Sequence, residues 1–236
     1  MQAQILLNVN AQKHLVAKAL CRYVDFSKRV YIAYGSTNHY LLHHLGIEIQ
    51  KAYMAGCNTN GKFNITLTRD KFVILKNYKP VDIKDFEITS KDVFIKGANA
   101  LWYENGKKHS AVCAADPNGG TYGNFYIKAV NRGSRVIIPV THEKLIPYFV
   151  PASQDADFAT GSKIAMLRLF AGEVFTEIEA FKLLFGLEAE VICAGGIGDS
   201  KGAVGFLVRG ADVKKALEFA EEYNAYEILP PWECAF

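Results

Sequence analysis

The sequence lacks the features that would assign it to a membrane, to secretion or to nucleic acid. No apolar run approaches the ~18 residues that a membrane-spanning helix needs. The amino-terminal Met1-Gln2-Ala3-Gln4 has neither the charged start nor the apolar stretch of a signal peptide. The 27 basic residues are scattered among 24 acidic ones, for a net charge of +3, and form no basic stripe. We therefore expect a cytoplasmic protein that binds neither a membrane nor DNA or RNA.

The sequence also lacks closely spaced cysteines of the kind that bind a metal or form a redox motif. The five cysteines are odd in number and widely separated, with no Cys-x-x-Cys pair. His39 and His43 are one helical turn apart, but neither a Glu-x-x companion nor a third ligand accompanies them. A polar helix face is the simpler explanation for these two histidines. We expect reduced thiols, no metal and no cofactor.

Two glycine-bearing loops are the most informative feature that is present. Residues 34–38 and residues 118–123 each stand where a helical pattern begins. Glycine lets the backbone approach a ligand, and the unpaired N–H groups and positive dipole end of a helix attract a phosphate or carboxylate. The alternative is that glycine makes the turn while Ser or Thr only caps the helix. Two such loops in one chain favour an anionic small molecule as the ligand.

Strands and helices alternate over the first part of the chain. Buried strands are expected at residues 30–33, 92–96 and 135–140, with helices after the first and before the third. This order predicts an α/β domain over residues 1–155, with a Rossmann-like, mainly parallel sheet that carries helices on both faces. Ligands of such sheets bind beyond the carboxyl ends of the strands. The expected ligand contacts there are Gly35, Ser36, Thr37, Asn38, Gly97, Asn99, Asn118, Gly119, Gly120 and Thr121.

The second part of the chain has a different order. Its patterns predict strand, helix, two strands, helix and strand at residues 164–170, 175–185, 189–194, 203–209, 213–223 and 225–229. The order is that of a small α+β ferredoxin-like domain, over residues 162–230, after a linker at 151–161. A sheet edge or helix face of this domain could mediate self-association, so a homo-oligomer is expected.

The motifs of the first domain resemble those of a known superfamily. Asp92-Val-Phe-Ile-Lys-Gly-Ala-Asn-Ala-Leu101, followed by Asn105-Gly106 and Gly120-Thr121-Tyr122, is similar to the Gly-Ala-Asp, Asn-Gly, Gly-Thr-Tyr series of methylthioribose-1-phosphate isomerases and initiation-factor regulatory subunits. The wider superfamily includes ribose-5-phosphate isomerase, glucosamine-6-phosphate deaminase, class I CoA transferases and the sugar-phosphate sensors of some bacterial repressors. The resemblance covers about Val30 to Val140 and implies that the two glycine loops hold the phosphate of a sugar phosphate, or the equivalent part of a larger ligand.

The departures from the family pattern bear on catalysis. Lys96 precedes Gly97, and the neutral Asn99 stands where the isomerases have an aspartate. An amide cannot act as a general base, because its lone pairs are too weakly basic. The repressor-type sensors tolerate Gly-Ala-Asn and only bind, so the resemblance favours a sensor or binding protein.

Three residues keep an enzymatic alternative open. Glu104 lies in a Glu-Asn-Gly run, similar to those that supply the carboxylate nucleophile of class I CoA transferases, or in an ordinary turn. Asp116 precedes the second glycine loop, where it is either an acid–base group or part of a turn. Lys96 could pair with a phosphate or stabilise an enediolate, or simply reach solvent. An isomerase or transferase using these residues is the second hypothesis.

Overall fold

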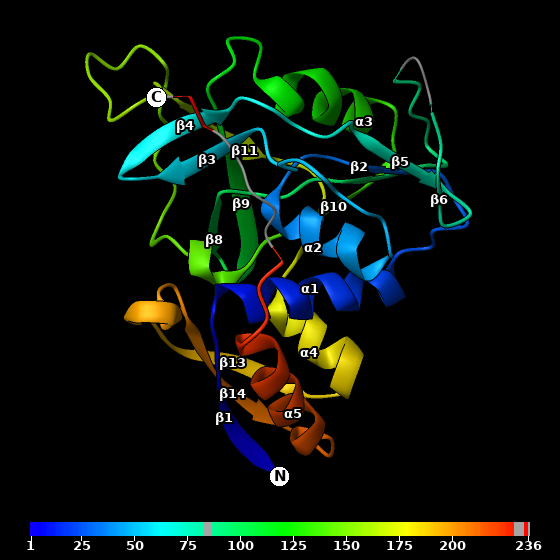
Figure 1. Ribbon diagram of the computed structural model, residues 1–236, viewed down its shortest axis with the longest axis vertical. Coiled ribbons are helices and arrows are strands. Elements are labelled where there is room, and N and C mark those ends of the chain that lie inside the picture. Colours follow the sequence, from blue (N-terminus) through cyan, green and yellow to red (C-terminus); the bar gives the residue numbers. More distant parts are fainter. Residues whose placement is uncertain (83–85, 229–233, 236) are drawn as a thin grey trace.

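The computed structural model describes residues 1–82, 86–228 and 234–235, and it shows a mixed α/β protein (Figure 1). The helices within these residues are α1 (Val9–Tyr23), α2 (Ser36–His44), α3 (Ile127–Asn131), α4 (Glu177–Phe185) and α5 (Val213–Asn224). The strands are β1 (Gln2–Leu7), β2 (Val30–Ile32), β3 (Gly56–Thr59), β4 (Lys62–Thr66), β5 (Val73–Lys76), β6 (Lys79–Pro80), β7 (Val93–Ile95), β8 (Ala100–Glu104), β9 (Lys107–Ala114), β10 (Arg135–Pro139), β11 (Ala165–Leu169), β12 (Glu173–Phe175), β13 (Glu188–Ala194), β14 (Val204–Arg209) and β15 (Cys234–Ala235).

A six-stranded sheet in the order β12-β10-β7-β2-β5-β6 forms the centre of the upper lobe in Figure 1. Its first four strands run parallel to one another, whereas β5 pairs antiparallel with both β2 and β6. The sheet is therefore mixed, and its strand order does not establish the Rossmann-like arrangement expected from the sequence. Every residue of β2 and β7 is buried, as in parallel strands that are covered on both faces.

Helices cover both faces of this sheet because its strands alternate their side chains between two cores. Val30 and Ile32 of β2 point into one core with residues of α1 and α2. Tyr31 points into the other, with Tyr126 and Ala129 of the helical segment that ends in α3. The strand ends between these layers are thereby held in fixed positions, which is the requirement for a precise binding site.

The carboxyl-terminal lobe differs from the expected ferredoxin-like order. Its antiparallel sheet is β1-β14-β13, so the strand beside β14 comes from the amino terminus. The expected first strand is β11, which pairs instead with β9, and residues 225–228 form no strand. Burial explains the exchange: Ile5 and Leu7 of β1 alternate inward and complete a core with Phe181 and Phe206.

Two sequence expectations concern cysteines and membranes. Cys21, Cys113 and Cys193 are free thiols, but Cys57 is in a disulfide, so the expectation that all thiols are reduced is wrong at that position. In the parts of the chain that the structure describes, every helix is too short or too polar to cross a bilayer.

The buried His14 and the half-buried His44 connect α1, α2 and the segment after α5. Nδ1 of His14 lies 3.0 Å from Nε2 of His44, and Nε2 of His14 lies 3.3 Å from the carbonyl oxygen of Tyr226. Burial, reinforced by the neighbouring His44, lowers the pKa of His14 to about 3. Burial and the neighbouring His43 lower the pKa of His44 to about 4. Both imidazoles are therefore neutral in the folded protein at pH 7.

This cluster predicts a loss of stability in mild acid. Below about pH 6.5 these two histidines are protonated in the unfolded chain but stay neutral in the folded protein. Each therefore lowers the free energy of unfolding by about 1.4 kcal/mol for every pH unit between pH 6.5 and its folded pKa. The contribution of the two neutral histidines to the free energy of unfolding is fully present above pH 6.5 and falls as the pH drops toward 4. Urea unfolding at pH 7 and pH 4.5 measures it. His44→Gln should reduce the difference between the two pH values, and an unchanged difference would contradict the assignment.

Candidate functional site

A cleft of about 760 Å³ lies where β2, β7 and β10 end. These strands are parallel, so their carboxyl ends share one edge of the sheet. The cleft lining contains most of the residues that the sequence singled out, namely Gly35, Ser36, Thr37, Lys96, Gly97, Asn99, Asp116, Gly119, Gly120 and Thr121. A second hollow of about 590 Å³ beside α4 includes neither glycine loop. The structure thus brings the two loops together in one place.

The first glycine loop presents the amino terminus of α2 to the cleft. The N–H group of His39 makes the first helical hydrogen bond, to the carbonyl oxygen of Gly35 at 3.0 Å. The N–H groups of Ser36 and Thr37 precede that bond and have no partner within the helix. Because Ser36 and Thr37 also line the cleft, their amides and hydroxyls are donors for an anion there.

Asn38 has a different role from the one expected. Its side chain is fully buried and is not part of the cleft lining. Its Nδ2 donates to the carbonyl oxygens of Ala33 at 2.7 Å and Ile95 at 3.3 Å. Asn38 therefore connects the start of α2 to the ends of β2 and β7.

The second glycine loop is shaped by two left-handed residues. Gly119 has φ +78° and Gly120 has φ +54°, a region that side chains other than glycine, Asn and Asp rarely occupy. The loop is closed at its base by Asp116, whose Oδ1 accepts from the N–H group of Asn118 at 2.7 Å. Asn118 itself is exposed and lies outside the cleft lining. Asp116 thus both forms a turn and reaches the cleft.

Lys96 is the most unusual group in the cleft. It directly follows β7, only 5% of its surface is exposed, and within the described residues its ammonium makes no hydrogen bond or ion pair. Its backbone N–H group donates to the carbonyl oxygen of Ile137 at 3.0 Å. Burial, with a smaller contribution from the charge of Lys144, lowers the pKa of Lys96 to about 8. A buried ammonium without an anionic partner is energetically unfavourable, and an anion bound beside it would offset that cost.

Three further charged residues were missed by the sequence analysis. Nζ of Lys13 lies 3.7 Å, and Nζ of Lys144 3.9 Å, from Oε1 of Glu143. Lys144 and Glu143 follow the end of β10, so the rule that placed Lys96 at the cleft could have found them. Lys13 comes from α1, and no local pattern connects it to the cleft. Basic side chains outnumber acidic ones in the lining: Lys13, Arg69, Lys96 and Lys144 against Asp116 and Glu143.

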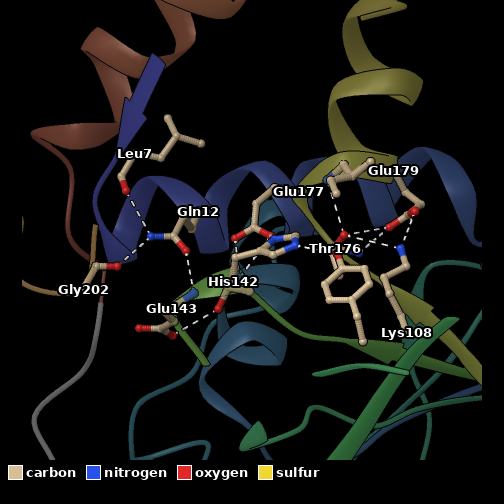
Figure 2. Close-up of polar contacts among 12 residues, drawn as sticks. Leu7, Gln12, Lys108, His142, Glu143, Thr176, Glu177, Glu179 and Gly202 are labelled. Carbon is tan, nitrogen blue, oxygen red and sulfur yellow. Dashed lines mark hydrogen bonds and ion pairs between the residues drawn. The ribbon is translucent and has the colours of Figure 1, made fainter. Parts of the chain in front are cut away.

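A buried network fixes the turn that carries Glu143 and Lys144 (Figure 2). Oε1 of Gln12 accepts from the N–H group of Glu143 at 3.1 Å, while Nε2 of Gln12 donates to the carbonyl oxygens of Leu7 and Gly202. On the other side, Nδ1 of His142 lies 2.5 Å from Oε2 of Glu177. The turn is therefore held from both α1 and α4.

Glu104 lies away from the cleft. Its carboxylate is on the β8–β9 hairpin, 3.1 Å from the guanidinium of Arg168, and its side chain is half exposed. Asn105 and Gly106 both have positive φ, as in a two-residue hairpin turn. The ordinary turn, which was the alternative for the Glu-Asn-Gly run, describes what the structure has at this position.

Comparison of the chain with protein-family models and with curated proteins yields no match. The geometry of the cleft is therefore the basis for a functional proposal.

Proposed function

We propose that this chain binds a phosphorylated or otherwise anionic small metabolite, such as a sugar phosphate or a CoA ester, between its two glycine loops. The observation that supports this most is the buried ammonium of Lys96, which lines the cleft and makes no hydrogen bond or ion pair among the described residues. A bound anion would compensate the cost of keeping that charge away from water.

The remaining lining suits the same kind of ligand. The amino terminus of α2 supplies backbone donors and a positive dipole end, and Thr121 supplies a hydroxyl. Lys13 and Lys144 share a single carboxylate, Glu143, so their combined charge is only partly neutralised. Charge-assisted hydrogen bonds from such groups to phosphate oxygens are among the strong ones in proteins.

An isomerase or transferase is the second candidate, because Asp116 lines the same cleft as Lys96. In that case the carboxylate would move protons while the ammonium stabilises developing negative charge. A reaction through Glu104 has less support, since that carboxylate pairs with Arg168 outside the cleft.

The test is a thermal-shift screen against inorganic phosphate, sugar phosphates, nucleotides and CoA esters. A ligand at ~100 times its dissociation constant should add about 2.7 kcal/mol to the free energy of unfolding. Gly120→Asp adds a negative charge at the second loop, in a left-handed position that aspartate tolerates, and Thr121→Val removes one donor. We expect Gly120→Asp to weaken anion binding at least tenfold and Thr121→Val to weaken it less.

The matched control is Glu104→Gln, which changes a charge outside the cleft. Its anion-induced shift should equal that of the wild type. If Gly120→Asp and Thr121→Val also bind with unchanged affinity, the loops are structural turns and the proposal fails.

A further inference from the structure

We infer that Lys96 is a covalent site: its amine attacks the carbonyl carbon of an anionic aldehyde or ketone held in the cleft and forms an imine. The inference rests on the proposed function: the amino terminus of α2, Lys13 and Lys144 would bind the charged end of such a ligand, and Lys96 would face its carbonyl carbon. Lys96 follows β7, is almost fully buried and lines the cleft, so its amine is held by the sheet beside both glycine loops. Such placement is what converts a slow bimolecular addition into a fast one.

The charge environment separates Lys96 from the other two lysines of the cleft. The ammonium groups of Lys13 and Lys144 each lie within 4 Å of the Glu143 carboxylate, at 3.7 and 3.9 Å. Burial lowers the pKa of Lys13 as well, but the attraction of Glu143 opposes that shift. Lys96 makes no ion pair in the described parts of the chain, and its charged neighbour is another lysine, Lys144. A nucleophilic lysine must lose its proton, and these two conditions favour that loss.

The neutral amine is available at ordinary pH. With a pKa of about 8, Lys96 is unprotonated in about a tenth of the molecules at pH 7. A solvent-exposed lysine, with its pKa near 10.4, is unprotonated in fewer than about one molecule in a thousand. The difference is an advantage of roughly two hundredfold in reactive amine.

The step is balanced without any oxidant or reductant. The amine lone pair forms the N–C bond while the carbonyl π electrons move to oxygen, and one proton passes from nitrogen to that oxygen, giving a carbinolamine. The C–O bond then breaks, the hydroxyl leaves as water with a proton from an acid, and the nitrogen lone pair completes the C=N bond of a protonated imine. Loss of its N–H proton to the conjugate base of that acid gives the neutral imine. The carboxyl groups of Asp116 and Glu143 line the same cleft and are the groups available to carry these protons.

Reductive trapping tests the inference on the full chain. The protein is incubated with glyceraldehyde 3-phosphate at pH 8, reduced with sodium borohydride and mapped by peptide mass spectrometry. We expect a secondary-amine adduct on Lys96, formed at least tenfold faster than on any other lysine. Excess inorganic phosphate should slow the labelling, and unphosphorylated glyceraldehyde should label Lys96 at least tenfold more slowly.

Two variants keep the result interpretable. Lys96→Arg keeps the charge but cannot form an imine, so it should lose the adduct and retain a phosphate-induced thermal shift. If the arginine does not fit the buried position, Lys96→Met replaces it; this variant should also lose the adduct, and its phosphate-induced shift should be smaller than that of the wild type because it lacks the ammonium. Labelling spread evenly over many lysines, or an unlabelled Lys96, overturns the covalent site.

The outcomes for the two proposals are distinguishable. A phosphate-induced shift without an adduct at Lys96 disproves the imine and leaves the anion site standing. An adduct at Lys96 that forms equally fast with unphosphorylated glyceraldehyde, in a protein that phosphate does not stabilise, supports the covalent site and disproves the anion site.

Discussion

Replacing Glu177 with alanine is expected to lower the free energy of unfolding by about 3–5 kcal/mol. The carboxylate is fully buried and accepts from the backbone N–H group of His142 at 2.9 Å, as well as lying 2.5 Å from Nδ1 of the same residue. Alanine would leave both donors of His142 without an acceptor in a place that water does not reach. Urea denaturation of the variant and the wild type at pH 7 measures the change.

The orientation of His142 supports this expectation. The hydroxyl of Tyr103 lies 2.9 Å from Nε2 of His142, and burial raises the pKa of Tyr103 to about 12, so the phenol keeps its proton. If Tyr103 donates to Nε2, Nδ1 carries the hydrogen that is directed at Glu177. Both ring nitrogens of His142 then have a hydrogen-bond partner, one on a side chain of β8 and one on a side chain of α4.

The control for Glu177 is a glutamate on the surface, Glu104. Glu104→Ala removes an exposed contact with Arg168 and should cost less than about 1 kcal/mol. Equal effects of the two substitutions would contradict the role assigned to burial. Since His142 begins the turn that carries Glu143 and Lys144, Glu177→Ala should also weaken anion binding, whereas Glu104→Ala should not.

The second large effect has the opposite sign: Lys96→Met is expected to stabilise the ligand-free protein at pH 7 by about 3 kcal/mol. Burial holds the pKa of Lys96 at about 8 instead of 10.5, so protonation costs more in the folded state than in the unfolded chain. Methionine has a similar length and fills the space without a charge. Urea denaturation at pH 7, without added anions, measures the gain.

The pH dependence of this gain follows from the same pKa shift. Between about pH 8 and 10.5 the unfolded chain binds the proton that folded Lys96 has lost, so the stability of the wild type rises with pH there. The advantage of Lys96→Met should therefore be constant below about pH 7 and shrink toward zero by pH 10.5. A constant advantage at all pH values would mean that the variant improves packing and does not relieve a charge.

Ligand binding should reverse the order of stability. Saturating phosphate should stabilise the wild type more than Lys96→Met, because the bound anion pairs with the ammonium that the variant lacks. A residue that lowers the free energy of unfolding when the ligand is absent, but increases the affinity for the ligand, is typical of a binding site. A lysine with a purely structural role would not show this combination.

Local sequence patterns identified much of the cleft. The strands of residues 30–33, 92–96 and 135–140 were expected because continuous apolar runs are typical of strands buried on both faces, and β2, β7 and β10 lie within them. The carboxyl ends of neighbouring parallel strands share one edge, and this geometric rule placed Gly35, Lys96 and their neighbours at one cleft. Whether that cleft binds a metabolite stays a prediction.

The pairing of the later strands could not be obtained in this way. The pattern of residues 164–170 correctly predicts a strand, β11, but nothing local distinguishes a partner in its own lobe from β9. Register and partner depend on which apolar faces can be buried together, and β1, nearly two hundred residues away along the chain, completes the sheet with β14.

Local chemistry thus determined the two glycine loops, the buried strands and the position of Lys96, since each depends on residues close together in the chain. Tertiary structure alone decided that Lys13 reaches the same cleft, that Glu104 does not, and that the ammonium of Lys96 has no hydrogen-bond or ion-pair partner among the described residues. The physical reason is that burial and charge pairing depend on every element that packs around a group, and no local stretch of sequence contains that information.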